Sequence, residues 1–321
     1  MEVYGINSKI KKNVLLKNCT TFKIGGPAKY FLEAKTKEDL IQAVAWAKEK
    51  GTAFFVLGGG SNVLASDNGY AGLVVKLRLA SCQVRTTKIV AEAGVKLDEL
   101  VKLSAKSGLT GIEWAAGIPK ATVGGAIYNN AGAFESCMAD IVETVEVFDA
   151  ADSKIKKLNK EKCNFTYKQT IFKQQENLIV LSCCLKLRKG NCKKIREKIA
   201  RVLDYREKNH PMDLPSAGCI FINPFNISAA ELIERAGLKG QKMGDAQISQ
   251  KHANFIVNLG KARAADVLRL IDLIKKTVKQ KFGIALKEEI RYLSCQPPTT
   301  LSGVRKTNTK LCLKDKAPKP F

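Results

Sequence analysis

One segment, residues 53–62, constrains the fold of this chain more than any other. Its first half, Ala53-Phe-Phe-Val-Leu57, has the apolar and aromatic composition of a buried strand and continues without a break into Gly58-Gly-Gly60. A strand and a helix precede it, and the helix opens at Thr36 with a capping-box pattern. This order predicts a βαβ-like unit whose glycine turn can direct backbone N–H groups at an anion.

A second glycine-rich segment runs from Gly117 to Ala133. Polar residues lie between its glycines, which leaves room for a large flat ligand against the backbone; a tightly packed crossover would explain the glycines alone. The first segment lacks the Lys-Ser/Thr ending of a P-loop and the G-x-G-x-x-G spacing of a Rossmann site. Both of those nucleotide-binding motifs are therefore disfavoured.

A single thiol, that of Cys219, follows the turn Pro215-Ser-Ala-Gly218 and precedes a short apolar strand that Asn223-Pro224 ends. Because the Ala-Gly pair adds no bulk before it, the thiol can approach a ligand closely. A buried structural cysteine on a strand fits the same residues. Taken alone, this segment favours the structural interpretation.

The chain has 321 residues and a formal net charge of +24. Its lysines are spread along the whole sequence without a nucleic-acid motif, which favours a basic surface that attracts anionic small molecules. The ten cysteines form no C-x-x-C pair and only His210 and His252 accompany them, so we expect no metal site. With no secretory signal pattern and no run of about 18 apolar residues, we expect a cytoplasmic protein outside the membrane.

The rest of the chain mixes strands and helices in an α+β pattern. Helices are expected from Leu97 to Ser107, from about Cys192 to Lys208, and around Val267 to Val278, where apolar residues recur at helical spacing. Strands dominate from the second glycine segment to about Leu187. We expect divisions at residues 1–80, 81–190 and 191–294, followed by a disordered basic tail at 295–321.

Several motifs occur together in an order that resembles one enzyme family. They are Thr20-Thr-Phe-Lys-Ile-Gly-Gly-Pro27, Gly58-Gly-Gly-Ser-Asn-Val-Leu64, Gly117-Ile-Pro-Lys-Ala-Thr-Val-Gly-Gly125, Tyr167-Lys-Gln-Thr-Ile-Phe172, the segment around Cys219, and His252-Ala-Asn-Phe-Ile-Val-Asn258. From about Asn18 to Leu293 the chain resembles the UDP-N-acetylenolpyruvoylglucosamine reductases, also called UDP-N-acetylmuramate dehydrogenases. The resemblance implies a two-part FAD-binding domain of the PCMH, or vanillyl-alcohol-oxidase-like, type at 1–80 and 81–190. A C-terminal α+β substrate-binding domain would follow at 191–294.

The same resemblance implies the cofactors FAD and NADPH. The residues that it implies for FAD binding are Gly58, Gly59, Gly60, Ser61, Asn62, Gly117, Thr122, Gly124, Gly125 and Asn129. In this family NADPH reduces FAD, and the reduced flavin passes hydride to the enolpyruvyl group of a UDP-sugar. The product is UDP-N-acetylmuramate, a precursor of peptidoglycan.

Cys219, Lys168 and Glu289 are the catalytic residues that the resemblance implies. Cys219 is the proton donor where many relatives have serine, and a thiol is a far stronger acid than a hydroxyl, although it is open to oxidation. Glu289 orients and tunes the neighbouring groups; it is selected over Glu288 because an apolar residue and arginine follow it.

Lys168 stabilises the negative charge that develops on the substrate, at a position where the family pattern has arginine. Lysine keeps the charge but loses the planar fork that grips a carboxylate with two parallel hydrogen bonds. We expect function to survive with weaker orientation of the substrate carboxylate. Arg188 or Lys173 could compensate for the lost fork.

Tyr167 and Asn223 are the substrate-binding residues that the resemblance implies, Asn223 for the UDP portion; His252 is expected to be structural. Only about fifty residues separate Lys168 from Cys219, too few for the tyrosine-bearing lobe that one form of the family inserts. The chain therefore resembles the shorter form. Its expected partners are the UDP-sugar and NADPH, with no specific nucleic acid and no membrane.

Three alternatives stay open from the sequence. One is a flavin oxidase of the same fold that uses oxygen rather than NADPH. Neither histidine lies near residues 58–62, which argues against an oxidase with flavin linked covalently to histidine there. The others are a basic protein that binds nucleic acid, and a flavin-binding homologue of the reductases that is impaired by Lys168.

Overall fold

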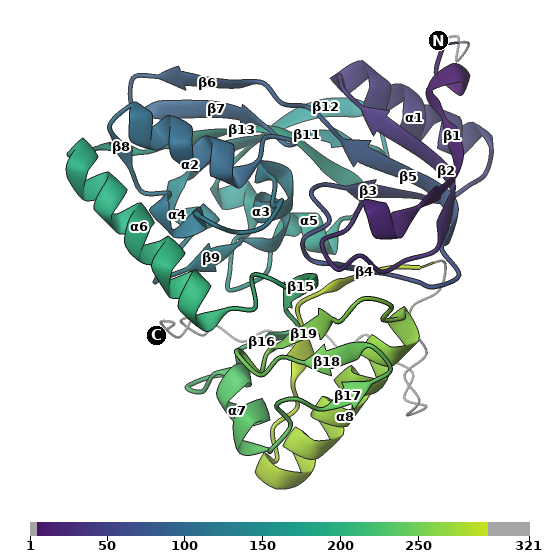
Figure 1. Cartoon of the computed structure of the whole chain (residues 1–321). Helices are drawn as coiled ribbons and strands as arrows, with labels where there is room; N and C mark the ends of the chain where they lie inside the picture. Colours follow the sequence, from purple (N-terminus) through teal and green to yellow (C-terminus); the bar gives the residue numbers. More distant parts are fainter. Residues whose placement is uncertain (1–4, 295–321) are drawn as a thin grey trace.

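The computed structural model describes residues 5–294, so the basic tail expected at 295–321 lies outside the described residues. Two sheet-based parts lie side by side, and a smaller lobe lies below both of them in Figure 1. One continuous apolar core joins the first two parts, whereas a separate core fills the lobe. The first two parts thus bury apolar faces against each other, and the lobe buries its own.

The first part is a four-stranded sheet with one covering helix. Its strands, in spatial order, are β1 (Lys11–Leu15), β2 (Pro27–Ala34), β5 (Tyr70–Leu77) and β3 (Phe54–Leu57). β2, β5 and β3 are parallel, and α1 (Lys37–Glu49) forms the crossover from β2 to β3. Thr36 caps α1 through the expected capping box with Asp39. The expected βαβ unit is therefore present, with a further strand between its two strands.

The second part is a five-stranded antiparallel sheet covered by helices. Its strands, in spatial order, are β12 (Lys154–Asn159), β11 (Val142–Asp149), β13 (Leu178–Lys186), β7 (Lys88–Glu92) and β6 (Cys82–Arg85). Its helices are α2 (Leu97–Lys106), α3 (Val123–Asn129), α4 (Met138–Ile141) and α5 (Ile171–Gln174). α3, which forms the middle of the second glycine-rich segment, packs against β7 and β13. Its glycines allow this contact, because a Cβ on Gly124 would meet Ala93 of the segment after β7.

Helix α6 (Cys192–Asn209) runs along the second part rather than along the lobe (Figure 1). It packs against α2, the 3-10 helix η3 (Glu113–Ala115) and β8 (Leu109–Thr110), and β14 (Arg188–Lys189) just before it pairs with β8. The sequence had suggested a division at residue 191. We propose instead that the division between the second part and the lobe lies after Asn209.

The C-terminal lobe is a small α+β unit. Its sheet has the order β15 (Ser216–Cys219), β19 (Phe255–Asn258), β18 (Ala246–Ile248) and β17 (Lys242–Met243), and its helices are α7 (Ala229–Arg235) and α8 (Ala264–Phe282). Val267, Ile271, Ile274 and Val278 of α8 are all buried, as their spacing predicts. Gly283 ends α8 in the left-handed conformation that favours glycine.

The end of the described chain returns from the lobe to the first part. β21 (Arg291–Leu293) pairs in parallel with β4 (Val63–Ala65), directly after the first glycine loop. Two smaller pairings complete the fold: β16 (Phe221–Ile222) with β20 (Lys287–Glu288), and β9 (Gly132–Ala133) with β10 (Ser136–Cys137). This return carries Glu289, which lies just before β21, to the glycine loop.

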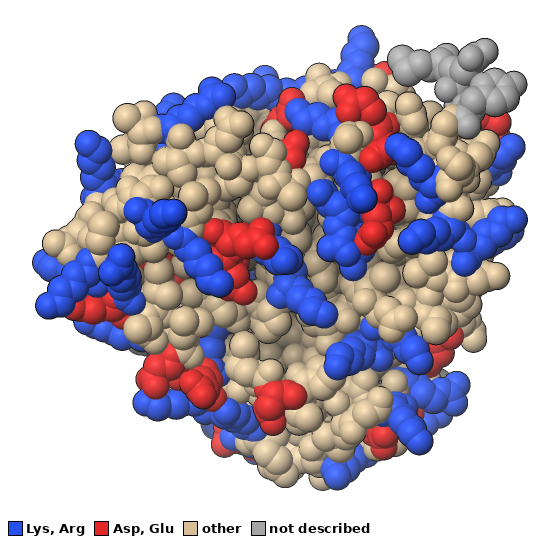
Figure 2. Space-filling view, turned by 45° about the horizontal axis from the view of Figure 1, so that its top comes forward, with Lys and Arg blue, Asp and Glu red and all other residues tan. Residues whose placement is uncertain are grey.

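The surface is basic without a single basic patch on the face drawn in Figure 2. That view shows Lys and Arg side chains scattered between acidic and uncharged ones. None of the helices within residues 5–294 combines the length and apolar character needed to span a membrane. The scattered charge is consistent with the expectation drawn from the spread of lysines along the sequence.

Candidate active site

A cavity of about 1080 Å³ runs between the two sheet-based parts and the lobe. Its volume is at the upper end of the range typical of ligand pockets. Nine of the expected cofactor-binding residues line it: Gly58, Gly59, Gly60, Ser61, Asn62, Thr122, Gly124, Gly125 and Asn129. The two glycine-rich segments, far apart in the sequence, thus form neighbouring walls of one cavity.

These walls fit a large flat cofactor, because the two glycine-rich segments touch with almost no side chain between them. A Cβ on Gly59 would collide with the carbonyl oxygen of Lys120, and one on Gly58 would approach the Thr122 hydroxyl to 2.6 Å. Within the described residues the Thr122 hydroxyl is buried without a hydrogen-bond partner, although Thr122 lines the cavity. Burying a hydroxyl without a hydrogen bond costs free energy, and a ligand that bonds to it would remove this cost. The walls therefore fit an occupant with hydrogen-bonding groups, such as FAD.

Gly117 differs from the other expected cofactor-binding residues, because it is not among those that line the cavity. Its φ of 73° is in the left-handed region, and its N–H donates to Asp98 Oδ1 at 3.0 Å. A Cβ there would meet Leu203 of α6 at 2.8 Å. Its observed contacts are therefore those of a turn on which α6 packs, and a direct role in cofactor binding stays a prediction.

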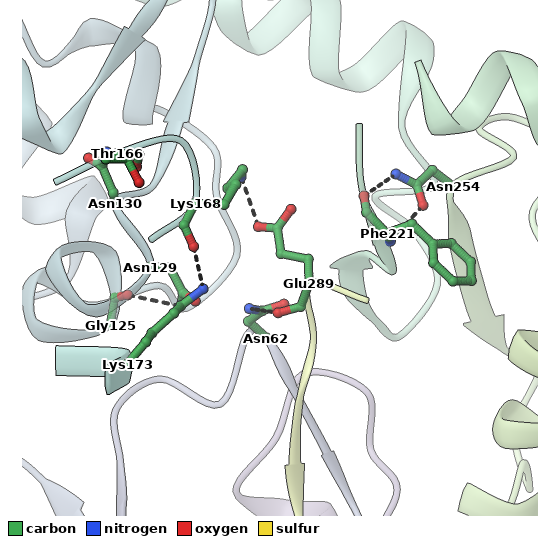
Figure 3. Close-up of polar contacts among 10 residues, drawn as sticks. All are labelled: Asn62, Gly125, Asn129, Asn130, Thr166, Lys168, Lys173, Phe221, Asn254 and Glu289. Atoms are coloured by element: carbon green, nitrogen blue, oxygen red, sulfur yellow. Dashed lines mark hydrogen bonds and ion pairs between the residues drawn. The ribbon is translucent and has the colours of Figure 1, made fainter. Parts of the chain in front are cut away.

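Lys168 and Glu289 form a close ion pair in the cavity wall, with Lys168 Nζ 2.8 Å from Glu289 Oε1 (Figure 3). Their side chains are only 17% and 13% exposed. Burial alone would lower the pKa of Lys168, but the Glu289 carboxylate outweighs it and raises that pKa. Lys168 is therefore a fixed cation at neutral pH.

Cys219 lies at the end of β15 and lines the same cavity, close enough to this ion pair for both of its charges to act on the thiol. Burial, with the neighbouring Glu289 carboxylate, raises the pKa of the Cys219 thiol to about 12. The thiol is therefore protonated at neutral pH. The structure thus brings together the three residues expected to be catalytic, which come from the second part, the lobe and the returning segment before β21.

The backbone around Glu289 explains why this glutamate, and not Glu288, faces Lys168. Asn62 of the glycine loop donates its side-chain N–H to the Glu289 carbonyl at 3.1 Å, and Arg291 N–H donates to the Asn62 carbonyl at 2.9 Å. Glu288 points the other way and contacts Lys275. The alternation of side chains along an extended segment separates the two carboxylates.

Two parts of this chain match families of known proteins. Residues 28–159 match the family model described as FAD binding domain, and residues 210–293 match that described as UDP-N-acetylenolpyruvoylglucosamine reductase, C-terminal domain. The UDP-N-acetylenolpyruvoylglucosamine reductase of Caldanaerobacter subterraneus is 43% identical over 89% of this chain and 94% of its own length. That of Clostridium novyi is 40% identical over 89% of this chain and 92% of its own.

This chain belongs to the UDP-N-acetylenolpyruvoylglucosamine reductase family. The crystal structure of the Thermus caldophilus reductase agrees, with a TM-score of 0.75 and 37% identity over 88% of this chain and 99% of that one. The fold is therefore the expected one: a two-part FAD-binding domain of the vanillyl-alcohol-oxidase-like type followed by a C-terminal α+β domain. As expected of the shorter form, residues 169–218 hold only α5, β13, β14, α6 and the start of β15, with no inserted lobe.

Tyr167 and Asn223, expected to bind substrate in this reductase family member, are not among the residues that line the cavity. The Asn223 side chain accepts a hydrogen bond from Ala229 N–H at the start of α7. The backbone N–H of Asn223 donates a hydrogen bond to Tyr167, and burial raises the pKa of the Tyr167 phenol. Both residues lie near Lys168 and Glu289, and a role for them in substrate binding stays a prediction.

Arg206 of α6 is a cavity residue that the sequence reasoning missed. It is 8% exposed, donates from Nη2 to the Trp114 carbonyl at 3.0 Å, and has no partner for Nε within the described residues. Burial and Glu289 raise the pKa of Cys219, and the Arg206 charge acts in the opposite direction without reversing that shift. The sequence held no signal for it, because Arg206 is one of many cations in a basic helix.

Proposed function

We propose that Lys168, Glu289 and Cys219 carry out the chemistry of the reaction that defines this family. The protein reduces UDP-N-acetyl-enolpyruvoylglucosamine to UDP-N-acetylmuramate, in peptidoglycan biosynthesis, as an NADPH-dependent flavoprotein. The observation that carries the residue assignment is the buried Lys168–Glu289 pair next to Cys219, in a cavity lined by both glycine-rich segments.

The two glycine-rich segments would hold the FAD. Gly58, Gly59 and Gly60 allow close approach to the backbone, and Thr122 offers a hydroxyl without a partner in the described residues. When bound, FAD supplies the hydride that it has taken from NADPH. The apolar residues and backbone around it would keep water from the reacting centre.

Lys168 would stabilise the negative charge of the reaction. Hydride addition at the β-carbon of the enolpyruvyl group leaves an electron pair on the α-carbon, delocalised into the carboxylate. A cation held in place before the reaction stabilises this enolate-like state without reorganisation. Glu289 would hold the Lys168 ammonium in place through its 2.8 Å ion pair.

Cys219 would complete the reaction as the acid. Its Sγ–H proton goes to the α-carbon, so that one hydride and one proton have been added across the double bond, and the thiolate is left. The raised pKa of the thiol ensures that the proton is present when it is needed. Lys168 and Arg206 favour the thiolate that forms, since each cation acts to lower the pKa of Cys219.

The anionic UDP-sugar and NADPH are the partners that we infer, with Tyr167 and Asn223 as substrate contacts. We place the reaction in the cytoplasm, where both compounds are available. The eight described cysteines are free, which fits a reducing compartment. We infer no specific nucleic-acid or membrane partner, because no feature of the described residues calls for one.

An anaerobic spectroscopic experiment tests the function and the role of Cys219 together. We expect a flavin spectrum that NADPH bleaches and that the enolpyruvyl UDP-sugar restores. Absence of bleaching would contradict the reductase function, and recovery only with oxygen would indicate an oxidase. If NADPH bleaches the flavin of the wild type but the sugar does not restore its spectrum, the protein is an impaired homologue.

Two variants at position 219 separate the proton donor from the rest of the site. We expect Cys219→Ala to bleach with NADPH like the wild type but to recover with the sugar at least about a hundredfold more slowly, as is typical when a general acid is lost. Cys219→Ser, which restores a proton on the side chain, should keep measurable product formation. If Cys219→Ala forms product at the wild-type rate, the thiol is not the acid.

A further inference from the structure

Lys173 lies on the short helix α5, which begins shortly after the turn that contains Lys168. Its Nζ donates to the backbone carbonyl of Lys168 at 2.8 Å, as Figure 3 shows. Lys173 is half-buried and, among residues 5–294, forms no ion pair with a carboxylate. The Lys173 Nζ also lies over the Tyr128 ring, 5.9 Å from its centroid. A carbonyl and an aromatic ring, rather than a carboxylate, therefore hold the Lys173 ammonium.

The carbonyl that Lys173 holds belongs to a strained turn. Thr166 and Gln169 exchange backbone hydrogen bonds at 3.1 and 3.2 Å, so that Tyr167 and Lys168 form the tip of a tight turn. Lys168 has a φ of 57°, a left-handed conformation that favours glycine or asparagine. A lysine keeps such a conformation only where the surroundings impose it.

Two side chains impose it from either end of the turn. Asn130 donates from Nδ2 to the Thr166 carbonyl at 2.9 Å, and Lys173 donates to the Lys168 carbonyl (Figure 3). Asn130 itself ends α3, the helix that begins in the second glycine-rich segment. The turn is thereby tied to a wall of the cavity, and the direction of the Lys168 side chain follows from its backbone.

The side chains around Glu289 carry more positive than negative charge. Burial lowers the pKa of Lys173, and the nearby charges of Lys168 and Arg291 lower it further against the effect of Glu289, so these groups lie close together. Arg291 also pairs with Glu176 at 3.1 Å, so three cations accompany two carboxylates and leave one surplus positive charge beside the cavity. An incoming carboxylate would be attracted to it.

We propose that Lys173 is a positioning residue that holds Lys168 in its turn and so directs the Lys168 ammonium toward Glu289 and the substrate carboxylate. An arginine at position 168 could align itself on a carboxylate through its fork, whereas a single ammonium depends on its backbone for direction. Arg188, the other candidate for compensation, is exposed on β14 and is not among the cavity-lining residues. The inference rests on the proposed role of Lys168.

Substitutions at position 173 test the proposal in the full-length flavoprotein. We expect Lys173→Met to lower kcat about tenfold or more and to raise the dissociation constant of the enolpyruvyl UDP-sugar several-fold, measured by calorimetry with the oxidised protein. Lys173→Arg, which keeps a charged donor, should stay within about threefold of the wild type. Flavin content and the midpoint of urea unfolding should be the same in all three proteins, because the role is not a folding one.

A double-mutant cycle with Lys168→Gln shows whether Lys173 acts through Lys168. Lys168→Gln should lower kcat strongly, and adding Lys173→Met should lower it no further. An equal additional loss in the Lys168→Gln background would overturn the proposal, as would wild-type kinetics in Lys173→Met. If Lys168→Gln keeps the wild-type rate, the proposed role of Lys168 is itself wrong. Should Lys173→Met not bind flavin, the cycle is made with Lys173→Gln, to which the same outcomes apply.

Discussion

Cys219 shows at the scale of one residue how surroundings change the chemistry of a side chain. At pH 8 a thiol with a pKa near 12 has roughly a thousandfold less thiolate than an ordinary thiol. Only the thiolate is alkylated rapidly. The same burial that keeps the acid protonated should therefore also protect it from electrophiles, which reduces the disadvantage of cysteine relative to serine.

We predict that iodoacetamide at pH 8 modifies Cys219 at least about a hundredfold more slowly than Cys192 in the folded holoprotein. Cys192 serves as the internal control because it is exposed, at the start of α6. Mass spectrometry of the two peptides over time measures both rates in one sample. Equal rates would show that the Cys219 thiol is ionised and accessible, and would remove the basis for its role as the acid.

At the scale of secondary-structure elements, the helices were predictable and the long-range strand pairs were not. The capping box at Thr36 involves only neighbours in sequence, so it indicated correctly where α1 begins. The pairing of β21 with β4 joins segments more than two hundred residues apart, and no local pattern encodes it. Each strand has only three residues, too few for the alternation of apolar and polar residues to be recognised.

In the site, too, some residues were predictable from sequence and others were not. The glycine loops and Glu289 could be identified because motifs mark them, and the structure brings them to one cavity. Arg206 could not, because what distinguishes it is burial against Trp114 rather than its neighbours in sequence. The left-handed φ of Lys168 could not be predicted from sequence either, because lysine seldom adopts that conformation.

Helix α8 offers an element-scale prediction about how the lobe is attached. Its N-cap residue, Arg263, makes no side-chain capping bond; instead Asp67, from the segment after β4, accepts from Ala264 and Ala265 N–H at 2.8 and 3.1 Å. Asp67 thus caps a helix of another part of the molecule, where its negative charge also favours the helix N-terminus.

We predict that Asp67→Ala lowers the free energy of unfolding by about 1–2 kcal/mol, measured by urea denaturation of the holoprotein. Asp67→Asn should lose less, because the amide oxygen can still accept one of the two bonds. Equal losses in both variants would indicate that the charge alone matters. An unchanged free energy in Asp67→Ala would show that water replaces the carboxylate without cost.

At the scale of the whole molecule, the two histidines of the chain lie in the lobe, where its chain continues from helix α6 of the FAD-binding domain. His210 follows α6 and His252 lies just before β19, with ring centroids 5.1 Å apart, and both pack against Phe255. Burial lowers the pKa of each to about 4; His252, Arg206 and Lys251 further lower that of His210, and Lys239 that of His252. Both imidazoles are therefore neutral in the folded protein at neutral pH.

A stability profile against pH follows from this pair. Unfolded histidine titrates near pH 6.5, so between about pH 6.5 and 4 the unfolded state binds more protons than the folded one. Stability is then fully present above about pH 6.5 and falls as the pH drops toward 4, by on the order of 2 kcal/mol for the pair after allowance for partial exposure. The described carboxylate whose pKa is lowered to about 2, Asp149, loses its contribution mainly below this window.

We predict that replacing both histidines, as His210→Gln and His252→Gln, lowers stability at pH 7.5 through lost packing but flattens its dependence on pH between 6.5 and 4. Urea unfolding of the wild type and the double variant at half-unit pH steps measures both slopes, and the single variants show how the effect divides. If the double variant keeps the wild-type slope, the protons are taken up elsewhere. The contact between His210 and His252 would then stabilise the start of the lobe by packing alone, with no contribution to acid sensitivity.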